Sequence, residues 1–539
     1  MKLRSALAAT TIALAALGGT SCDSPSRNKI ICDCAQGQRC ISGRCVDVPK
    51  QDESIFEPTA VRADCPAPVQ VYGGVVGPAA PPAAACARPI VDPRLPSDWV
   101  VHRERVPVGT EISFPVPAGA SGLTVVLQVV DAEENLPFRS LNGVATVPNT
   151  AVPLTITDPG GQVWFDDRKP LPADGTNELV HFALPSPFTG TLSIPNTSKA
   201  LEVVGTQGLP GGTWKLVVSD YAYECAATTE AAAICGPAAN LTPAPDFARY
   251  RAGVYDATVI ARPGPAPDVG TLDVALYVHP CPGGTYTATG ACAVTPLSAP
   301  GFASDPPMQR MVSSLAGFMA GAGVCLGTVT WYDLPDWARE RWKSGLDLDA
   351  STTCDLALGQ LLTLSVPGQH MNLFLVPTML VTDSSGTPGN VVGIDGTIPG
   401  PSGFSGTVQS GAAISAEGLR DTSRCTTEQS LSCGSDLTAY IAAHETGHFL
   451  GLYHTSEADG AEFDPIGDTP VCSCDQCAPA SDRASCPVGR GIVTGPDCLR
   501  SLSSCGGGRN LMFWLLGSVS TGRISPEQSR VIRANPLVR

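Results

Sequence analysis

The stretch HETGHFLGLYH, residues 444–454, decides the fold of the second half of the chain. On a helix, His444 and His448 lie one turn apart, so both imidazoles point to the same side. Gly451 breaks the helix, and the chain can then return His454 as a third ligand. Three neutral imidazole nitrogens and one water make an open tetrahedral zinc site. The sequence therefore predicts a zinc centre built around one helix.

Glu445 follows the first histidine and can reach a metal-bound water without being a ligand itself. Zinc lowers the pKa of such a water towards about 7, and Glu445 can take its proton while the water attacks a carbonyl. The alternative is a coincidental cluster in a core helix, but three of the seven histidines fall within this stretch. The others stand alone and are interpreted as structural or surface residues: His102, His181, His279 and His370.

The full pattern H-E-x-x-H-x-x-G-x-x-H resembles that of the metzincin metallopeptidases. Metzincins carry a methionine in a tight turn after the third histidine, and Met512 in the sequence NLMFW matches it. Within that clan the chain is similar to the pappalysin family. The shared features are GLYHT at the end of the motif, Asp468-Thr469-Pro470, a Cys-rich insert, the N-x-M turn and the SPEQ helix start at residues 525–528, which is also a capping box.

This resemblance covers about residues 270–539 and is strongest over 436–530. It implies an α+β zincin domain, with a twisted mixed sheet above a cleft and a Cys-rich lower subdomain. It also implies endopeptidase activity on extended protein or peptide substrates that lie antiparallel to an edge strand. We expect that strand within Val391–Ser415.

Trp514 departs from the pappalysin pattern. That family has a tyrosine two residues after the methionine, and its hydroxyl helps to hold the tetrahedral intermediate. An indole N–H can also donate a hydrogen bond, in a different geometry, so Trp514 is a candidate for oxyanion support. Losing one oxyanion donor costs about 10²–10³ in rate, so the alternative is that this protein has reduced or altered activity.

Four acidic residues follow the third histidine, in a region where related enzymes carry structural calcium. Hard carboxylates suit that ion, so calcium is a second expected cofactor. The alternative is a solvated acidic loop. The candidate ligands are Glu457, Asp459, Asp464 and Asp468.

The first 22 residues predict an export signal, with Lys2 and Arg4 before a short apolar stretch and small residues before Cys22. The sequence Gly19-Thr20-Ser21-Cys22 resembles the lipobox of bacterial lipoproteins, which implies a lipid on Cys22. The alternative is ordinary cleavage near Cys22 and release. We therefore expect an exported protein, either anchored in the cell envelope or secreted.

The cysteine count fits an oxidising compartment. Setting Cys22 aside leaves 20 of the 21 cysteines, an even number that can pair completely. The run CSCDQC at residues 472–477 is accordingly predicted to form disulfides, not a second metal site. Pairing between close neighbours is the simplest expectation: Cys65–Cys86, Cys225–Cys235, Cys281–Cys292, Cys325–Cys354 and Cys425–Cys433.

Three further parts precede the predicted zincin domain. Residues 23–49 hold four cysteines in a short span, which predicts a disulfide-stapled module acting as a stalk or a recognition knob. Residues 50–97, rich in Pro and Ala, predict a semi-rigid linker. From 98 to 265 short apolar runs alternate with turn signals, which predicts an antiparallel β-sandwich. Its stretch GGTWKLVVSDY, residues 211–221, resembles the closing strand of jelly-roll P-type domains.

From residue 270 the pattern becomes α+β. A strand at Leu272–His279 precedes a helix that Asp305 can cap, because Pro306 and Pro307 are tolerated in a first turn. Strands at Gly327–Tyr332 and Met371–Val376 follow. A helix starting near Asp436 then carries the histidine motif.

Composition narrows the function. Lys+Arg is 34 and Asp+Glu is 50, so the net charge of −16 repels phosphate backbones and argues against nucleic-acid binding. No internal stretch reaches the about 20 apolar residues of a membrane span, so we expect membrane contact only through the N-terminal lipid. The leading hypothesis is a zinc endopeptidase. The alternative is a non-catalytic adhesion or surface-binding lipoprotein that uses the β-sandwich, an option that Trp514 keeps open.

Overall fold

The computed structural model describes fourteen stretches of the chain and four short strands. The stretches are residues 59–78, 99–107, 109–129, 151–166, 178–181, 189–220, 254–282, 292, 297–348, 357–382, 388–457, 463–470, 507–514 and 522–539. The short strands are β1 (Gln38–Ile41), β2 (Arg44–Asp47), β7 (Arg139–Leu141) and β8 (Val144–Thr146). The predicted signal with Cys22, the pair Cys225–Cys235, Asp459 and the CSCDQC run lie outside the described residues.

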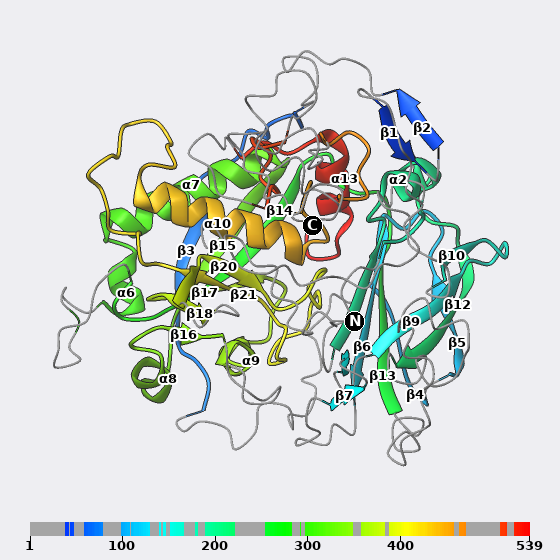
Figure 1. Cartoon of the computed structure of the whole chain (residues 1–539), viewed down its shortest axis with the longest axis horizontal. Helices are drawn as coiled ribbons and strands as arrows, with labels where there is room; N and C mark the ends of the chain where they lie inside the picture. Colours follow the sequence, from blue (N-terminus) through cyan, green and yellow to red (C-terminus); the bar gives the residue numbers. More distant parts are fainter. Residues whose placement is uncertain are drawn as a thin grey trace.

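The protein is β-rich, with two separate hydrophobic cores and disulfide bonds (Figure 1). The first core lies between two four-stranded antiparallel sheets. One sheet has the order β10-β9-β12-β5 and the other β11-β6-β13-β4. Their strands are β4 (Val100–Pro107), β5 (Glu111–Val116), β6 (Gly122–Val129), β9 (Ala151–Thr157), β10 (Val163–Asp166), β11 (Thr189–Ile194), β12 (Gly212–Asp220) and β13 (Val254–Arg262).

Alternation along the strands builds this sandwich core. In β5 every second residue is buried, and Phe114 meets Trp214 across the register of β5 with β12. From the other sheet, Val125 and Leu127 of β6 join the same core. Side chains of a strand point alternately to its two faces, which is how one apolar face per sheet arises. The predicted antiparallel sandwich is therefore present, with its strands inside the expected range.

The second core surrounds a six-stranded sheet of order β20-β21-β17-β14-β15-β3. All neighbours in it are parallel except β20, which is antiparallel to β21. In β14, Leu272, Val274 and Leu276 pack on one face of the sheet, while Ala275 and Tyr277 pack on the other. Its strands are β3 (Val69–Val75), β14 (Gly270–Val278), β15 (Val324–Asp333), β17 (Met371–Val376), β20 (Gly393–Asp395) and β21 (Ala412–Ser415).

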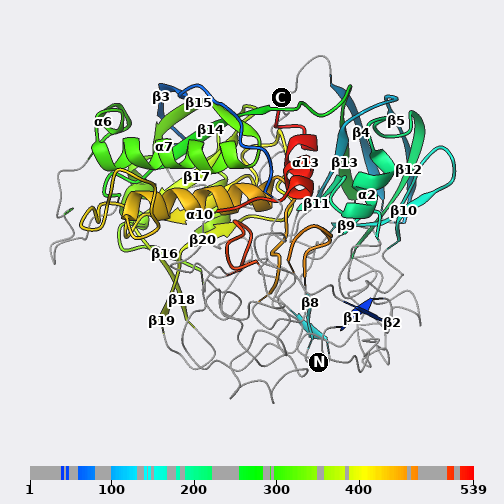
Figure 2. The ribbon, with the colours of Figure 1, turned by 90° about the horizontal axis from the view of Figure 1, so that it is seen from above.

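Helices cover both faces of this sheet. On one face α7 and α10 pack side by side, and α13 lies between them and the sandwich, as Figure 2 shows. The side chain of Asp305 accepts a hydrogen bond from the backbone N–H of Met308, as expected for the cap of α7. The helices are α2 (Ser198–Val204), α6 (Ala299–Phe302), α7 (Pro306–Gly321), α8 (Asp336–Arg341), α9 (Ala357–Leu362), α10 (Gly434–Phe449) and α13 (Pro526–Ala534). A small sheet adds β16 (Leu346–Asp347), β18 (Met379–Thr382) and β19 (Pro388–Val391).

The predicted linker at 50–97 contains part of the second sheet, which corrects that interpretation. Residues 69–75 form β3, which pairs in parallel with β15 at one end of the sheet. The preceding residues also attach there, since Ala60 N–H donates to the carbonyl of Ile524 and Ala63 N–H to that of Ala320. Four of the seven residues in VQVYGGV are Val or Tyr, which favour strands, a local signal that the Pro/Ala content of the flanking sequence masked.

The cysteine predictions were right for two pairs and wrong for two. Cys281–Cys292 and Cys425–Cys433 are bonded as expected. However, Cys65 is bonded to Cys325, so neither can pair with Cys86 or Cys354. Proximity in sequence fails here because the segment before β3 folds onto the strand that carries Cys325.

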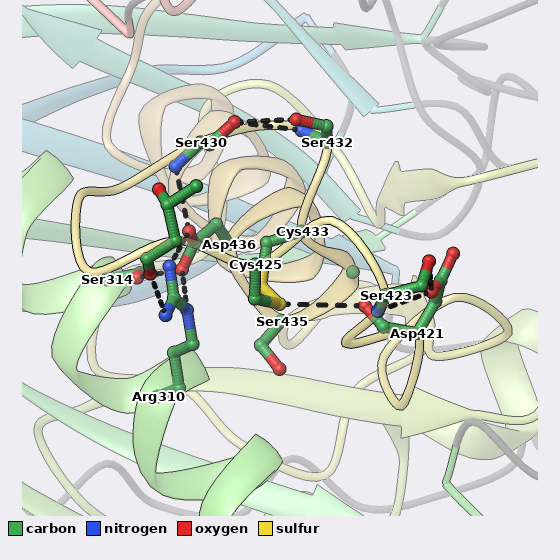
Figure 3. The surroundings of a disulfide bond; sticks show 12 residues. Arg310, Ser314, Asp421, Ser423, Cys425, Ser430, Ser432, Cys433, Ser435 and Asp436 are labelled. Carbon is green, nitrogen blue, oxygen red and sulfur yellow. Dashed lines mark hydrogen bonds and ion pairs between the residues drawn. A yellow bond between two sulfur atoms is a disulfide. The ribbon is translucent and has the colours of Figure 1, made fainter.

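A partly buried ion pair joins α7 to the start of α10, with the Arg310 side chain 28% exposed (Figure 3). The Nε and Nη2 atoms of Arg310 donate to the two carboxylate oxygens of Asp436 at 2.9 and 2.6 Å. Ser314 Oγ and the backbone N–H of Ser430 also donate to this carboxylate, at 2.5 and 2.8 Å. Asp436 is 0% exposed. The first turn of α10 is thereby fixed beside the Cys425–Cys433 loop.

No helix among the described residues combines the length and the apolar character needed to cross a membrane.

Candidate metal centre

Helix α10 places the first two histidines of the motif in the protein interior. Its C-terminal half reads AAHETGHF, and all of these residues are buried. The helix ends at Phe449, and Gly451 takes a φ of +111°, a conformation that glycine adopts readily. This turn brings His454 back to the helix, as the spacing predicts.

The three histidines bring their Nε2 atoms together. The Nε2 atom of His444 lies 3.0 Å from that of His448 and 3.3 Å from that of His454, and the latter two lie 3.2 Å apart. All three residues are buried. Nitrogens bound at about 2.0–2.1 Å to one zinc ion with tetrahedral angles lie about 3.3 Å from one another. The observed spacing fits three corners of such a tetrahedron.

Backbone carbonyls fix the protonation of two imidazoles. His444 Nδ1 lies 2.5 Å from the carbonyl oxygen of Leu511, and His448 Nδ1 lies 2.8 Å from that of Leu452. A carbonyl can only accept, so each Nδ1 carries the proton and each Nε2 a lone pair. Burial lowers the pKa of His444 and His448 well below the usual value, and the charge of neighbouring imidazoles lowers it further. The two rings are therefore neutral, and their Nε2 lone pairs point to one place where a cation can bind.

The third histidine has a different partner. His454 Nδ1 lies 3.1 Å from Glu457 Oε1, in a contact with a half-exposed carboxylate side chain. A carboxylate on the outer nitrogen orients the ring and raises its basicity as a ligand. Glu457, predicted as a calcium ligand, lies in this structure against the outer nitrogen of His454.

Glu445 lies next to this cluster and is 0% exposed. Neither of its carboxylate oxygens has a hydrogen-bond partner among the described residues. Burial raises the pKa of Glu445 well above its usual value, and the charge of Asp395 raises it further. An unpartnered buried carboxyl group is costly unless it serves a ligand or a reaction.

The edge strand β20 passes directly over Glu445. A Cβ atom on Gly393 would lie 2.4 Å from Glu445 Oε1, so glycine is required for this close approach. Asp395 lies two residues further, on the same face of the strand. It is 1% exposed, its Oδ2 has no partner among the described residues, and burial raises its pKa well above the usual value. Sequence reasoning missed Asp395, because a single acidic residue in a Gly-rich stretch carries no spacing signal.

Met512 packs beneath the helix. A Cβ atom on Gly447 would lie 2.4 Å from Met512 Sδ, so the sulfur touches the helix between the two histidine ligands. The Met512 backbone N–H donates to Asn510 Oδ1 at 2.8 Å, and its carbonyl accepts from the N–H of Thr455 at 3.0 Å. The turn therefore joins the methionine to the segment that carries the third histidine.

Trp514 is 2% exposed, and its Nε1–H has no acceptor among the described residues. A buried donor in this state can serve a ligand oxygen, and the role expected for Trp514 stays a prediction. No contact between Trp514 and the histidine cluster fixes that role.

The remaining acidic residues have other partners. Asp464 accepts from Thr469 Oγ1 at 2.6 Å, and Asp468 accepts from the backbone N–H of Glu527 at 3.0 Å, at the start of α13. Within the described residues, the three histidines are the only group of three or more His, Cys, Asp or Glu whose ligand atoms converge. Asp459 lies outside the described residues, so the calcium site stays a prediction.

No protein-family model matches this chain, and no curated protein does either. Among solved structures, a Bacillus licheniformis lipase in propeptide form is 12% identical over 32% of this chain and 24% of the lipase, with a TM-score of 0.15. The YXIM protein of Bacillus subtilis is 9% identical over 53% of this chain and 58% of its own, with a TM-score of 0.13. A family two carbohydrate esterase from Cellvibrio japonicus is 8% identical over 51% of this chain and 67% of the esterase, with a TM-score of 0.10. TM-scores this low say nothing about the fold or activity of this chain.

Proposed function

We propose that this protein is a zinc-dependent endopeptidase of the metzincin type. The observation that carries the proposal is the convergence of three Nε2 atoms at 3.0–3.3 Å beside a buried carboxyl group without partners. His444, His448 and His454 would hold the metal, and Met512 would support it from below. Zinc bound there would act as a Lewis acid on a carbonyl and acidify a water.

The residues of the chain have separate roles in this proposal. Glu445 accepts the proton of the attacking water and returns it to the leaving amine. Burial and the charge of Asp395 raise its pKa, which favours uptake of a proton. Burial of the whole cluster keeps bulk water from the reacting atoms, which strengthens every electrostatic interaction there.

The arrangement of the sheet supports a peptide substrate. β20 stands at one end of the strand order, antiparallel to its neighbour, and lies over Glu445. An extended peptide can add to such an edge through main-chain hydrogen bonds, which places its carbonyl groups near the metal. β20 lies within the range where we expect the edge strand.

The N-terminal sequence supports a place outside the cytoplasm. Three disulfides among the described residues, Cys65–Cys325 included, agree with an oxidising compartment. We include in the proposal that Cys22 carries a lipid, so that the peptidase acts on envelope or extracellular proteins. Calcium stays a separate prediction and is not part of this proposal.

The test compares the full exported chain with its Glu445→Gln variant, which keeps the shape of the side chain. Both proteins should bind one zinc per chain by metal analysis, because Glu445 is not a ligand. Only the parent should cleave a mixed peptide library. Cleavage by the variant at the parent rate would overturn the mechanism, and absence of zinc from the parent would overturn the proposal. A fragment starting at residue 270 is unsuitable, because it lacks β3.

Zinc without any cleavage would favour the second hypothesis, a scaffold for surface binding. The buried indole N–H of Trp514 in place of a tyrosine hydroxyl is the feature that favours it. A Trp514→Tyr variant separates the two outcomes, because it should raise the cleavage rate if the indole is the limiting feature.

A further inference from the structure

The turn between the second and third histidines lies against the β-sandwich. Gly451, the turning residue, is so close to strand β11 that a Cβ atom there would lie 2.9 Å from Ser193 Oγ. Just beyond it, Tyr453 precedes His454 directly in the chain. The peptide that returns the third ligand is therefore packed on a different sheet from the one that carries the helix.

His181 of the sandwich makes the second contact with this turn. The hydroxyl of Tyr453 donates to the backbone carbonyl of His181 at 3.2 Å. The two rings also meet edge to face, with centroids 4.6 Å apart. Aromatic pairs in this geometry attract each other through the positive edge of one ring and the negative face of the other.

The sandwich holds His181 firmly in place. Asn196 Nδ2 donates to the His181 carbonyl at 2.6 Å, and Asn196 Oδ1 accepts from the His181 N–H at 3.0 Å. Asn196 lies two residues after the end of β11 and is 1% exposed. The same short region of the sandwich therefore carries both contacts to the turn.

Further hydrogen bonds join the β-sandwich and α2 to the segment after His454 and to α13. The Ser198 N–H donates to the Pro465 carbonyl at 3.0 Å, and Ser198 Oγ accepts from the Gly467 N–H at 2.6 Å. Arg530 Nη2 of α13 donates to the carbonyl of Leu201 in α2 at 2.9 Å. In Figure 2 the sandwich and the helices α10 and α13 form one continuous body at this boundary.

We propose that the β-sandwich is a positioning element of the metal centre, which fixes His454 through the contacts of Ser193 and His181 with the turn. A metal site needs its ligands within about 0.5 Å of the correct positions, and residues outside the motif must supply that constraint. His444 and His448 are fixed by their own helix. His454 lies on an irregular segment, so its position depends on what the segment packs against. The inference rests on the proposed zinc site but concerns metal retention, not cleavage.

The experiment measures zinc release from the full chain into an excess of chelator. Tyr453→Phe removes the hydrogen bond to the sandwich, and His181→Ala removes the ring contact while leaving the backbone carbonyl. Each should release zinc roughly tenfold faster than the parent, the lower end of the effect of losing an outer-shell partner. The cobalt-substituted variants should also show a shifted d–d absorption spectrum.

Arg530→Ala is the matched control, because it breaks a contact of the same interface that does not touch the turn. It should leave the zinc release rate and the cobalt spectrum unchanged. Parent-like release from both Tyr453→Phe and His181→Ala, with zinc bound by the parent, would overturn this inference alone. Equal acceleration by all three variants would also overturn it, since general loosening would then explain the effect. A parent that binds no zinc would instead refute the proposed function.

Discussion

Replacing Arg310 with methionine tests how the first turn of α10 is held. The change removes two hydrogen bonds to the buried carboxylate of Asp436 and two further donations, to the carbonyls of Thr426 and Glu428 at 2.7 and 3.0 Å. Removing one partner of a buried ion pair costs about 3–5 kcal/mol. Because Ser314 and Ser430 still donate to Asp436, we expect a loss of about 3 kcal/mol in the free energy of unfolding.

The sandwich offers a matched control for this prediction. Arg105 donates to both carboxylate oxygens of Asp256, at 2.9 and 3.1 Å, in the same two-pronged geometry but on the surface. Exposed pairs contribute about 0–1 kcal/mol, so Arg105→Met should cost less than about 1 kcal/mol. The assay is urea unfolding of the oxidised chain, followed by tryptophan fluorescence. Equal losses for the two variants would refute the argument from burial.

The pH dependence gives a second check on the same pair. Burial alone would raise the pKa of Asp436, but the hydrogen bonds from Arg310, Ser314 and Ser430 prevail and lower it. A carboxyl group with a lowered folded-state pKa stabilises the fold above its unfolded pKa, near 3.9, and loses this contribution as the pH falls through the folded value. The stability difference between the parent and Arg310→Met should therefore be constant near neutral pH and shrink below about pH 4. An unchanged difference at pH 3 would contradict this reasoning.

Three other predictions concern single contacts. Glu457→Gln should weaken zinc binding roughly tenfold, by removing the carboxylate from His454 Nδ1, as measured by competition with a chelator; unchanged affinity would exclude an orienting role. Gly447→Ala should lower the unfolding free energy by about 1–3 kcal/mol, because its Cβ would displace the sulfur of Met512, and an unchanged melting temperature would contradict that contact. Burial lowers the pKa of His279 to about 4, so the folded state resists protonation of this ring. Between about pH 6.5 and 4, acid should therefore lower the unfolding free energy of the parent by about 3 kcal/mol more than that of His279→Gln. Parallel urea titrations of the two proteins measure this difference.

The histidine cluster was the most predictable part of the molecule. Helical periodicity alone places His444 and His448 on one side, and a glycine at 451 permits the return of the chain. The cap at Asp305 and the strand Met371–Val376 were equally local and agree with the structure. Such features follow from short-range rules, in which a few neighbouring residues determine the geometry.

What the sequence could not predict depends on contacts between distant segments. Asp395 approaches Glu445 only because β20 crosses above α10. The pairing of Cys65 with Cys325 spans 260 residues. No local pattern predicts that β3 joins a sheet whose other strands all come after residue 270 or begin there. Glu457 was placed in an acidic cluster by composition, whereas its geometry is set by the position of His454. Local rules carry no information about such long-range pairing.

The Cys65–Cys325 bond changes what proteolytic damage can do to this protein. All strands of the β-sandwich lie between these two cysteines in the sequence, so the bond closes a covalent loop that contains them. A protease that cuts the backbone anywhere between them leaves two polypeptides that remain covalently joined. Such a clipped molecule would run as one band on a non-reducing gel and as two after reduction. If Cys22 is lipidated, a nick in this region would not shed the metal-bearing half from the membrane, and release would require a reductant.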